Sequence, residues 1–213
     1  MKMVKLGMFD HSGVLSDDRK PVYEANMQLL EKYGHQRVSF EKWLSLSKAS
    51  AGDLIESFEI TVPKQEINKE YERVYSEVVN SGLRPKMYSD VPETLIKLKE
   101  MRLRLAVVSS HPATNLSREL REYGIVELFD KISGDPHSKK ERLIEICQGF
   151  EIPTTESFFV EDTIYGLRAG HQANVPCFGV TDGYHSREML ENEKTAIAII
   201  DSLSELPELV KRC

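Results

Sequence analysis

The chain has 213 residues, enough for one domain, or for a core with a smaller inserted unit, without disulfides or structural metal. Its formal net charge of −6 argues against nucleic acid and anionic membranes as main partners. Its three widely spaced cysteines predict a reducing compartment, and no stretch is apolar enough for a membrane span or a secretory signal. We therefore expect a cytoplasmic protein, while its oligomeric state stays open.

The first predicted element is a short apolar strand, Val4–Phe9, which ends at a carboxylate, Asp10. The chain then turns at Gly13. Buried parallel strands present ligand-binding groups at their C-terminal ends. The strand therefore predicts a nucleophile or ligand-binding carboxylate at such an end.

Residues 16–87 read as helices only. The predicted helices are Val22–Gly34, Ser39–Lys48, Leu54–Phe58 and Pro63–Ser81. Ser50 to Asp53 resembles a capping box that opens the third of them. Gly82 and Pro85 suit a linker after the last one. The pattern predicts an all-helical unit inserted after the first strand.

From residue 88 onward, strands and helices alternate. The predicted strands are Leu105–Val108, Phe129–Ser133, Phe158–Val160, Cys177–Val180 and Ala196–Ile200. The predicted helices are Val91–Glu100, Leu116–Tyr123, Arg142–Gln148 and Gly166–Asn174. This alternation predicts an α/β fold with a parallel sheet covered on both faces. We expect a Rossmann-like core of residues 1–15 and 88–213 and an all-helical domain of residues 16–87.

Four polar motifs occur in a fixed order along this pattern. They are Asp10-His-Ser-Gly13, Ser109-Ser110, Ser138-Lys139-Lys140 and Glu161-Asp162-Thr163, the last followed by Gly166 and Gly170. Together they resemble the motifs of the haloacid dehalogenase superfamily, in its branch of phosphoglycolate phosphatases and β-phosphoglucomutases. The resemblance covers nearly the whole chain, and the helical insert resembles the cap that many members carry after the first motif.

The resemblance implies a Mg²⁺-dependent phosphatase that acts on a small phosphorylated metabolite. Asp10 would attack phosphorus and form an aspartyl-phosphate. The implied magnesium site consists of Asp10, the backbone carbonyl of Ser12, Glu161 (through a water) and Asp162. The implied substrate contacts are His11, Lys48, Ser109, Ser110 and Lys139. Lys139 is preferred to its neighbour Lys140 on motif placement alone.

One residue departs from the family pattern. Ser12 stands where phosphatases of the superfamily carry a second Asp, which protonates the leaving group and then activates water. A serine hydroxyl is no comparable acid or base at neutral pH, and such help is typically worth ~10²–10⁴-fold in rate. Three functions remain open: a slow phosphatase that recruits another acid such as His11, an enzyme that cleaves a C–P bond like phosphonoacetaldehyde hydrolase, or a phosphate-binding relative with weak catalysis.

Lys48 separates the C–P cleaving enzyme from the phosphatase. The branch of the superfamily that cleaves C–P bonds uses a Schiff-base lysine in its cap. Such a lysine needs a lowered pKa in a partly dry site. If this chain cleaves C–P bonds, borohydride and a carbonyl substrate should trap an adduct on Lys48, detectable by mass spectrometry of its peptide. Normal phosphatase turnover without any adduct would eliminate C–P cleavage.

Overall fold

The computed structural model describes residues 3–46, 51–111, 113–134 and 138–212. For residues 51 and 52 it describes the backbone alone. It divides into two compact units: Met1–Ser16 with Met87–Cys213, and Asp17–Lys86. In the described part of the chain, no helix is both long and apolar enough to cross a bilayer.

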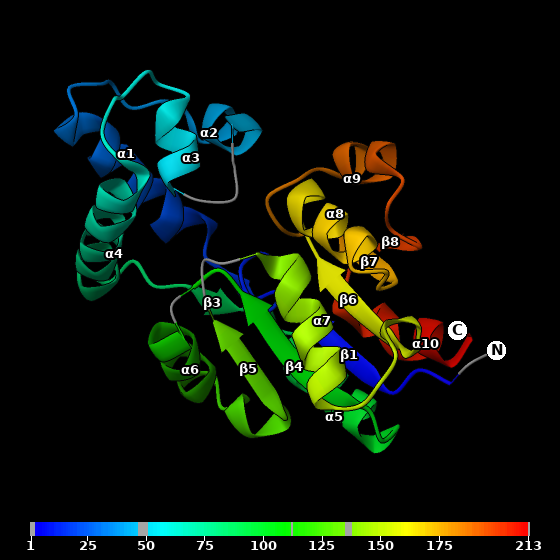
Figure 1. Cartoon of the computed structure of the whole chain (residues 1–213). Coiled ribbons are helices and arrows are strands. Elements are labelled where there is room, and N and C mark those ends of the chain that lie inside the picture. The colour runs from blue at the N-terminus through cyan, green and yellow to red at the C-terminus, as the bar shows by residue number, and fades with distance from the viewer. Residues whose placement is uncertain (1–2, 47–50, 112, 135–137, 213) are drawn as a thin grey trace. The chain divides into compact units, whose positions relative to one another are not determined.

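The larger unit is built on a six-stranded parallel sheet (Figure 1). Its strands, in spatial order, are β5 (Lys131–Gly134), β4 (Arg104–Ser109), β1 (Leu6–Phe9), β6 (Ser157–Glu161), β7 (Cys177–Val180) and β8 (Ala198–Ile200). Phe9 lies beside Val107 of β4 and Val160 of β6. The residues that follow these three central strands therefore meet at one edge of the sheet.

Helices cover both faces of this sheet (Figure 1). They are α5 (Val91–Glu100), α6 (Ala113–Glu122), α7 (Lys139–Gly149), α8 (Ile164–Gln172), α9 (Arg187–Glu193) and α10 (Leu206–Arg212). Successive residues of β1, Met8 and Phe9, belong to different hydrophobic clusters, as do Phe158 and Phe159 of β6. Both strands are therefore buried on both sides, which explains their nearly continuous apolar sequences. The predicted α/β fold with a parallel sheet is confirmed.

The smaller unit is helical. Its helices are α1 (Arg19–Lys32), α2 (Phe40–Leu46), α3 (Ala51–Glu56) and α4 (Lys64–Asn80). α4 contacts both α1 and α3, and the ring of Tyr23 in α1 packs edge-on against Phe40 and Trp43 of α2. The apolar face of α4 that the sequence predicts is buried through Ile67, Val74, Tyr75 and Val78.

Two strands of two residues each, β2 (Ser16–Asp17) and β3 (Lys86–Met87), pair where the chain passes between the units. The expectation of helices only over residues 16–87 is wrong at these positions. A pair of two-residue strands is too short to leave any alternation of apolar and polar residues in the sequence.

Candidate active site

Asp10 lies in a tight turn at the end of β1. Its backbone N–H donates to the carbonyl of Val160 at 3.0 Å, which continues the β1–β6 pairing by one residue. The carbonyl of His11 then accepts the N–H groups of Leu15 at 2.9 Å and Ser16 at 3.0 Å, and Gly13 adopts a φ of 73°. The turn leaves Asp10 only 6 % exposed, at the C-terminal edge of the sheet.

Asp162 follows β6 and is held by backbone packed closely around it. Its Oδ2 accepts the N–H of Tyr184 at 2.7 Å. A Cβ on Gly13 or on Gly183 would lie 2.1 Å from that oxygen, so only glycine fits at either position. Its other oxygen, Oδ1, is buried and accepts no hydrogen bond from the described residues. The chain thus fixes one oxygen of Asp162 and leaves the other for a ligand.

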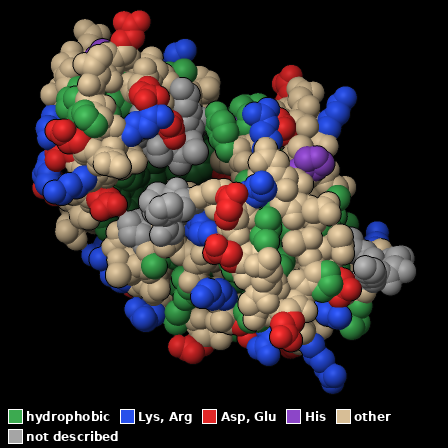
Figure 2. Space-filling model, in the orientation of Figure 1, with side chains coloured by type: hydrophobic (Ala, Val, Ile, Leu, Met, Phe, Trp, Pro, Cys, Tyr) green, Lys and Arg blue, Asp and Glu red, His purple; other side chains and the backbone are tan. Residues whose placement is uncertain are grey.

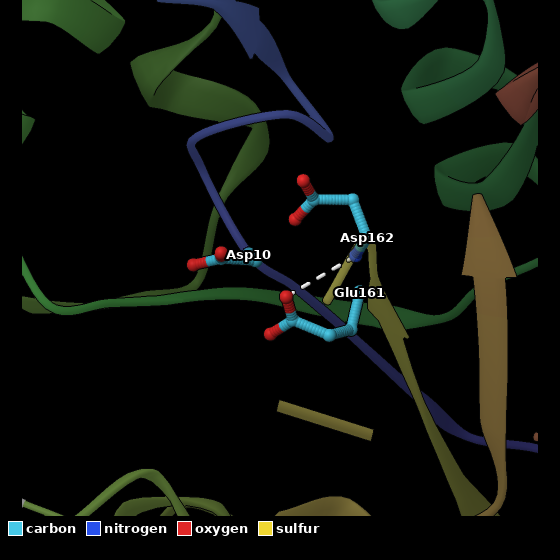
Figure 3. A group of neighbouring side chains, drawn as sticks. All are labelled: Asp10, Glu161 and Asp162. Carbon is cyan, nitrogen blue, oxygen red and sulfur yellow. Dashed lines mark hydrogen bonds between the residues drawn. The ribbon is translucent and has the colours of Figure 1, made fainter. Parts of the chain in front are cut away.

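Glu161 points its carboxylate back into the loop that it begins (Figure 3). Its Oε1 accepts the N–H of Asp162 at 3.1 Å and the hydroxyl of Thr163 at 2.8 Å. Its Oε2 accepts the ammonium of Lys139 at 2.6 Å. Glu161 therefore shapes the Asp162 loop and anchors the lysine.

Lys139 comes from the first turn of α7 and contacts two of the acids. Its Nζ lies 3.0 Å from Asp10 Oδ2 and 2.6 Å from Glu161 Oε2. The structure places Lys139, and not Lys140, in the site, because the side chain of Lys140 is 40 % exposed and its nearest recorded carboxylate is Glu141 at 3.9 Å.

Burial and crowding of charge perturb these groups. Burial raises the pKa of Asp10 to about 6, against the opposing charge of Lys139. The pKa of Asp162 rises well above its usual range, first through burial and then through the charges of Glu161 and Asp10. Burial opposes ionisation of Glu161 and Lys139 as well, but the opposite charges prevail. The pKa of Glu161 falls beside Lys139, and the pKa of Lys139 rises beside Asp10 and Glu161. The site thus brings three buried carboxyl groups together with one lysine, which contacts two of them.

The donor set fits a divalent cation. Asp10, Glu161 and Asp162 each offer an oxygen, and these three atoms lie within 4.8 Å of one another (Figure 3). The donors are all hard oxygens, which Mg²⁺ and Ca²⁺ prefer. A dication would offset the burial and the neighbouring negative charges that raise the pKa of Asp162, and the unused oxygen of Asp162 is available to bind it.

The second loop of the site follows β4. The side chain of Ser109 is buried, and its Oγ accepts the N–H of His111 at 3.2 Å, while Ser110 is exposed. Arg142 of α7 holds this loop in place, because its Nη1 donates to the carbonyls of Ser109 at 2.7 Å and Ser133 at 3.0 Å. Sequence reasoning missed Arg142, whose one signal was an arginine on a helix face lined with apolar residues.

The other predicted site residues are placed differently. His11, expected at the substrate, has no exposed surface, and its Nε2 donates to Glu119 Oε2 at 2.8 Å, so its ring lies behind the site and not on its surface. Ser12 is half-buried in the turn, where it forms an isolated backbone bridge with Ser16. Lys48 lies outside the described residues, so its predicted role stays a prediction.

These features define the class of protein: an α/β enzyme with a Rossmann-like sheet and an acidic site, able to hold a divalent metal, where its central strands end. The model of the family described as "Haloacid dehalogenase-like hydrolase" matches residues 8–180. The chain belongs to this family of hydrolases, as the four motifs predict.

Relatives and solved structures are similar to this chain over almost its full length. A phosphoglycolate phosphatase of Photobacterium profundum is 25 % identical over 98 % of this chain and 96 % of its own length. The crystal structure of a predicted phosphatase from Clostridium acetobutylicum is similar with a TM-score of 0.86, at 20 % identity over 99 % of this chain and 100 % of that one. CbbY from Rhodobacter sphaeroides, solved in complex with phosphate, has a TM-score of 0.78 at 20 % identity, with 96 % of each chain covered.

Proposed function

We propose that this chain is a Mg²⁺-dependent phosphatase that hydrolyses a small phosphorylated metabolite through an aspartyl-phosphate at Asp10. The observation that carries the proposal is the contact of Lys139 Nζ with both Asp10 and Glu161, beside an Asp162 oxygen that no described residue uses. This arrangement holds a carboxylate for attack and supplies positive charge for a phosphate dianion. Curated relatives named phosphoglycolate phosphatase support the same class of substrate.

In the first step, an oxygen of Asp10 attacks phosphorus, the ester P–O bond breaks, and the leaving oxygen takes a proton from solvent water. Lys139 favours the ionised form of Asp10 and attracts the oxygens of the phosphoryl group. The Ser109 hydroxyl and the N–H of Ser110 are the donors for the same oxygens. In the second step, water attacks phosphorus and loses a proton to solvent, the bond to Asp10 breaks, and inorganic phosphate leaves. A bound Mg²⁺ supplies charge neutralisation and alignment of the reacting oxygens.

The distribution of charge on the surface also indicates the class of ligand. Figure 2 shows acidic and basic side chains interspersed over the described residues of the face in view. With the net charge of −6, this favours a small anionic metabolite, bound locally at Lys139, over a polyanion bound across a surface.

The proposal is tested by a panel of small phosphomonoesters, assayed with Mg²⁺ and with a chelator in its place. We expect turnover only with the metal. Asp162→Ala should weaken Mg²⁺ binding at least about tenfold in a calorimetric titration, because it removes a buried carboxylate oxygen of the site that accepts no hydrogen bond from the described residues.

Asp182→Ala is the matched control, since Asp182 is an exposed carboxylate in the loop that holds Asp162. It should bind Mg²⁺ like the wild type. Unchanged Mg²⁺ affinity in Asp162→Ala would remove Asp162 from the metal site, and turnover that survives the chelator would refute metal dependence.

A further inference from the structure

A polar cluster, buried at three of its five residues, begins at the neighbour of Asp10. We call His11, Ser16, His111, Glu119 and Tyr123 the histidine cluster. The imidazole of His11 has no exposed surface and donates to Glu119 at 2.8 Å, while Glu119 itself is 6 % exposed. The ring of Tyr123 stacks on His11 at 6.2 Å, and its hydroxyl lies 2.7 Å from Ser16 Oγ.

The histidine cluster connects the two loops that carry the proposed chemistry. His11 is the neighbour of Asp10, and its carbonyl organises the turn after β1. His111 is two residues after Ser109, and its backbone N–H donates to Ser109 Oγ. The two imidazoles meet edge to face, with ring centroids 5.7 Å apart. Glu119, from α6, holds His11 in this contact.

A buried carboxylate–imidazole pair contributes little to the stability of a core. Taking a carboxylate and an imidazole out of water costs free energy, and their attraction often does no more than offset that cost. Apolar side chains of similar volume would fill the same space at least as stably. What the pair adds is a directed hydrogen bond of fixed length between α6 and the Asp10 turn, and hence a defined orientation.

We propose that Glu119 is a positioning residue that, through His11, fixes the Asp10 turn against the Ser109 loop at the separation that attack on phosphorus requires. The inference rests on the proposed phosphatase function. Misplacement of a reacting group by 1 Å can cost about 10²-fold in rate. Loss of the hydrogen bond from His11 to Glu119 should therefore slow the phosphorylation of Asp10, the step that precedes dephosphorylation.

Glu119→Leu, which removes the acceptor for His11, tests the inference, with Glu122→Leu, on the exposed side of the same helix, as its matched control. After rapid mixing with p-nitrophenyl phosphate and Mg²⁺, the burst of p-nitrophenol that reports phosphorylation of Asp10 should slow by about tenfold or more in Glu119→Leu and stay unchanged in Glu122→Leu. Affinity for orthovanadate, a phosphate analogue that becomes trigonal-bipyramidal when a nucleophile adds to it, needs both loops in place but no turnover and should fall in parallel.

The double variant His11→Phe/Glu119→Leu separates positioning from stability. It replaces the pair by apolar side chains and should unfold near the wild-type Tm, yet keep the slowed burst and the weakened vanadate binding. A wild-type burst rate in Glu119→Leu, or recovery of both Tm and burst rate in the double variant, would overturn the positioning role and leave the proposed function standing. A wild type that neither turns over phosphomonoesters nor binds vanadate would overturn both.

Discussion

Asp10→Asn should reduce turnover by about 10⁴-fold or more, because it replaces the proposed nucleophile by a neutral amide of the same shape. No other described carboxylate lies at the end of β1, and Glu161 is occupied by Lys139, Asp162 and Thr163. The protein should also lose its ability to become phosphorylated, which acid-quenched mass measurement of the intact chain can detect. Turnover at the wild-type rate with saturating substrate would exclude the covalent mechanism.

Asp10→Asn should fold like the wild type. Its stability without metal shows whether the Asp10 carboxylate raises or lowers the free energy of unfolding. Burial raises the folded pKa of Asp10 to about 6 from an ordinary value of 3.8, so between these values the folded chain binds more protons at this site than the unfolded chain. The contribution of Asp10 to the free energy of unfolding is therefore lost as pH rises from about 4 to about 6. In chelator, Asp10→Asn should gain stability relative to the wild type across this range. Urea midpoints at both pH values measure the change, and a decline of the variant relative to the wild type would contradict the burial argument.

The sequence predicted the core of the fold because its central strands are buried on both faces. Strands such as Phe158–Val160 stand out as apolar runs between polar turns, and the helices between them show one apolar face. The helices α9 and α10 were not predicted, since each spans seven residues and carries little periodic signal. Short elements of this kind depend on tertiary packing more than on their own sequence.

The candidate site was predicted unevenly for a related reason. Asp10 and Asp162 follow a strand, Ser109 ends one and Lys139 begins a helix, so short motifs identify them. Contacts between distant segments leave no such signal: Glu119 is 108 residues from His11, and Arg142 is 33 residues from Ser109. His11 illustrates the consequence, because its position beside Asp10 suggests substrate contact, whereas its buried partner directs the ring into the core.

Ser12→Asp should accelerate the wild-type enzyme by ~10²-fold, if residue 12 lacks only the general-base function. Lys139 and the acids for a metal are all in place around Asp10, so attack on a good leaving group needs nothing from residue 12. The second step does need it, because water must lose a proton as it attacks the aspartyl-phosphate. We therefore expect the wild type to bind phosphate well, to accumulate phosphorylated Asp10, and to turn over slowly.

Two measurements on the wild type, Ser12→Asp and Ser12→Ala test this expectation. They are the steady-state rate and the mass of the intact, acid-quenched chain, which detects phosphorylated Asp10. Ser12→Asp should lose the accumulated intermediate as its turnover rises. Ser12→Ala should behave like the wild type, since a hydroxyl and a methyl group are equally unable to accept the proton at neutral pH. A fast wild type without an intermediate, and Ser12→Asp no faster, would mean that another group already activates the water. His11 would have to release Glu119 to serve as that group, so Glu119→Leu would then alter the rate of dephosphorylation itself, and not only the attack by Asp10.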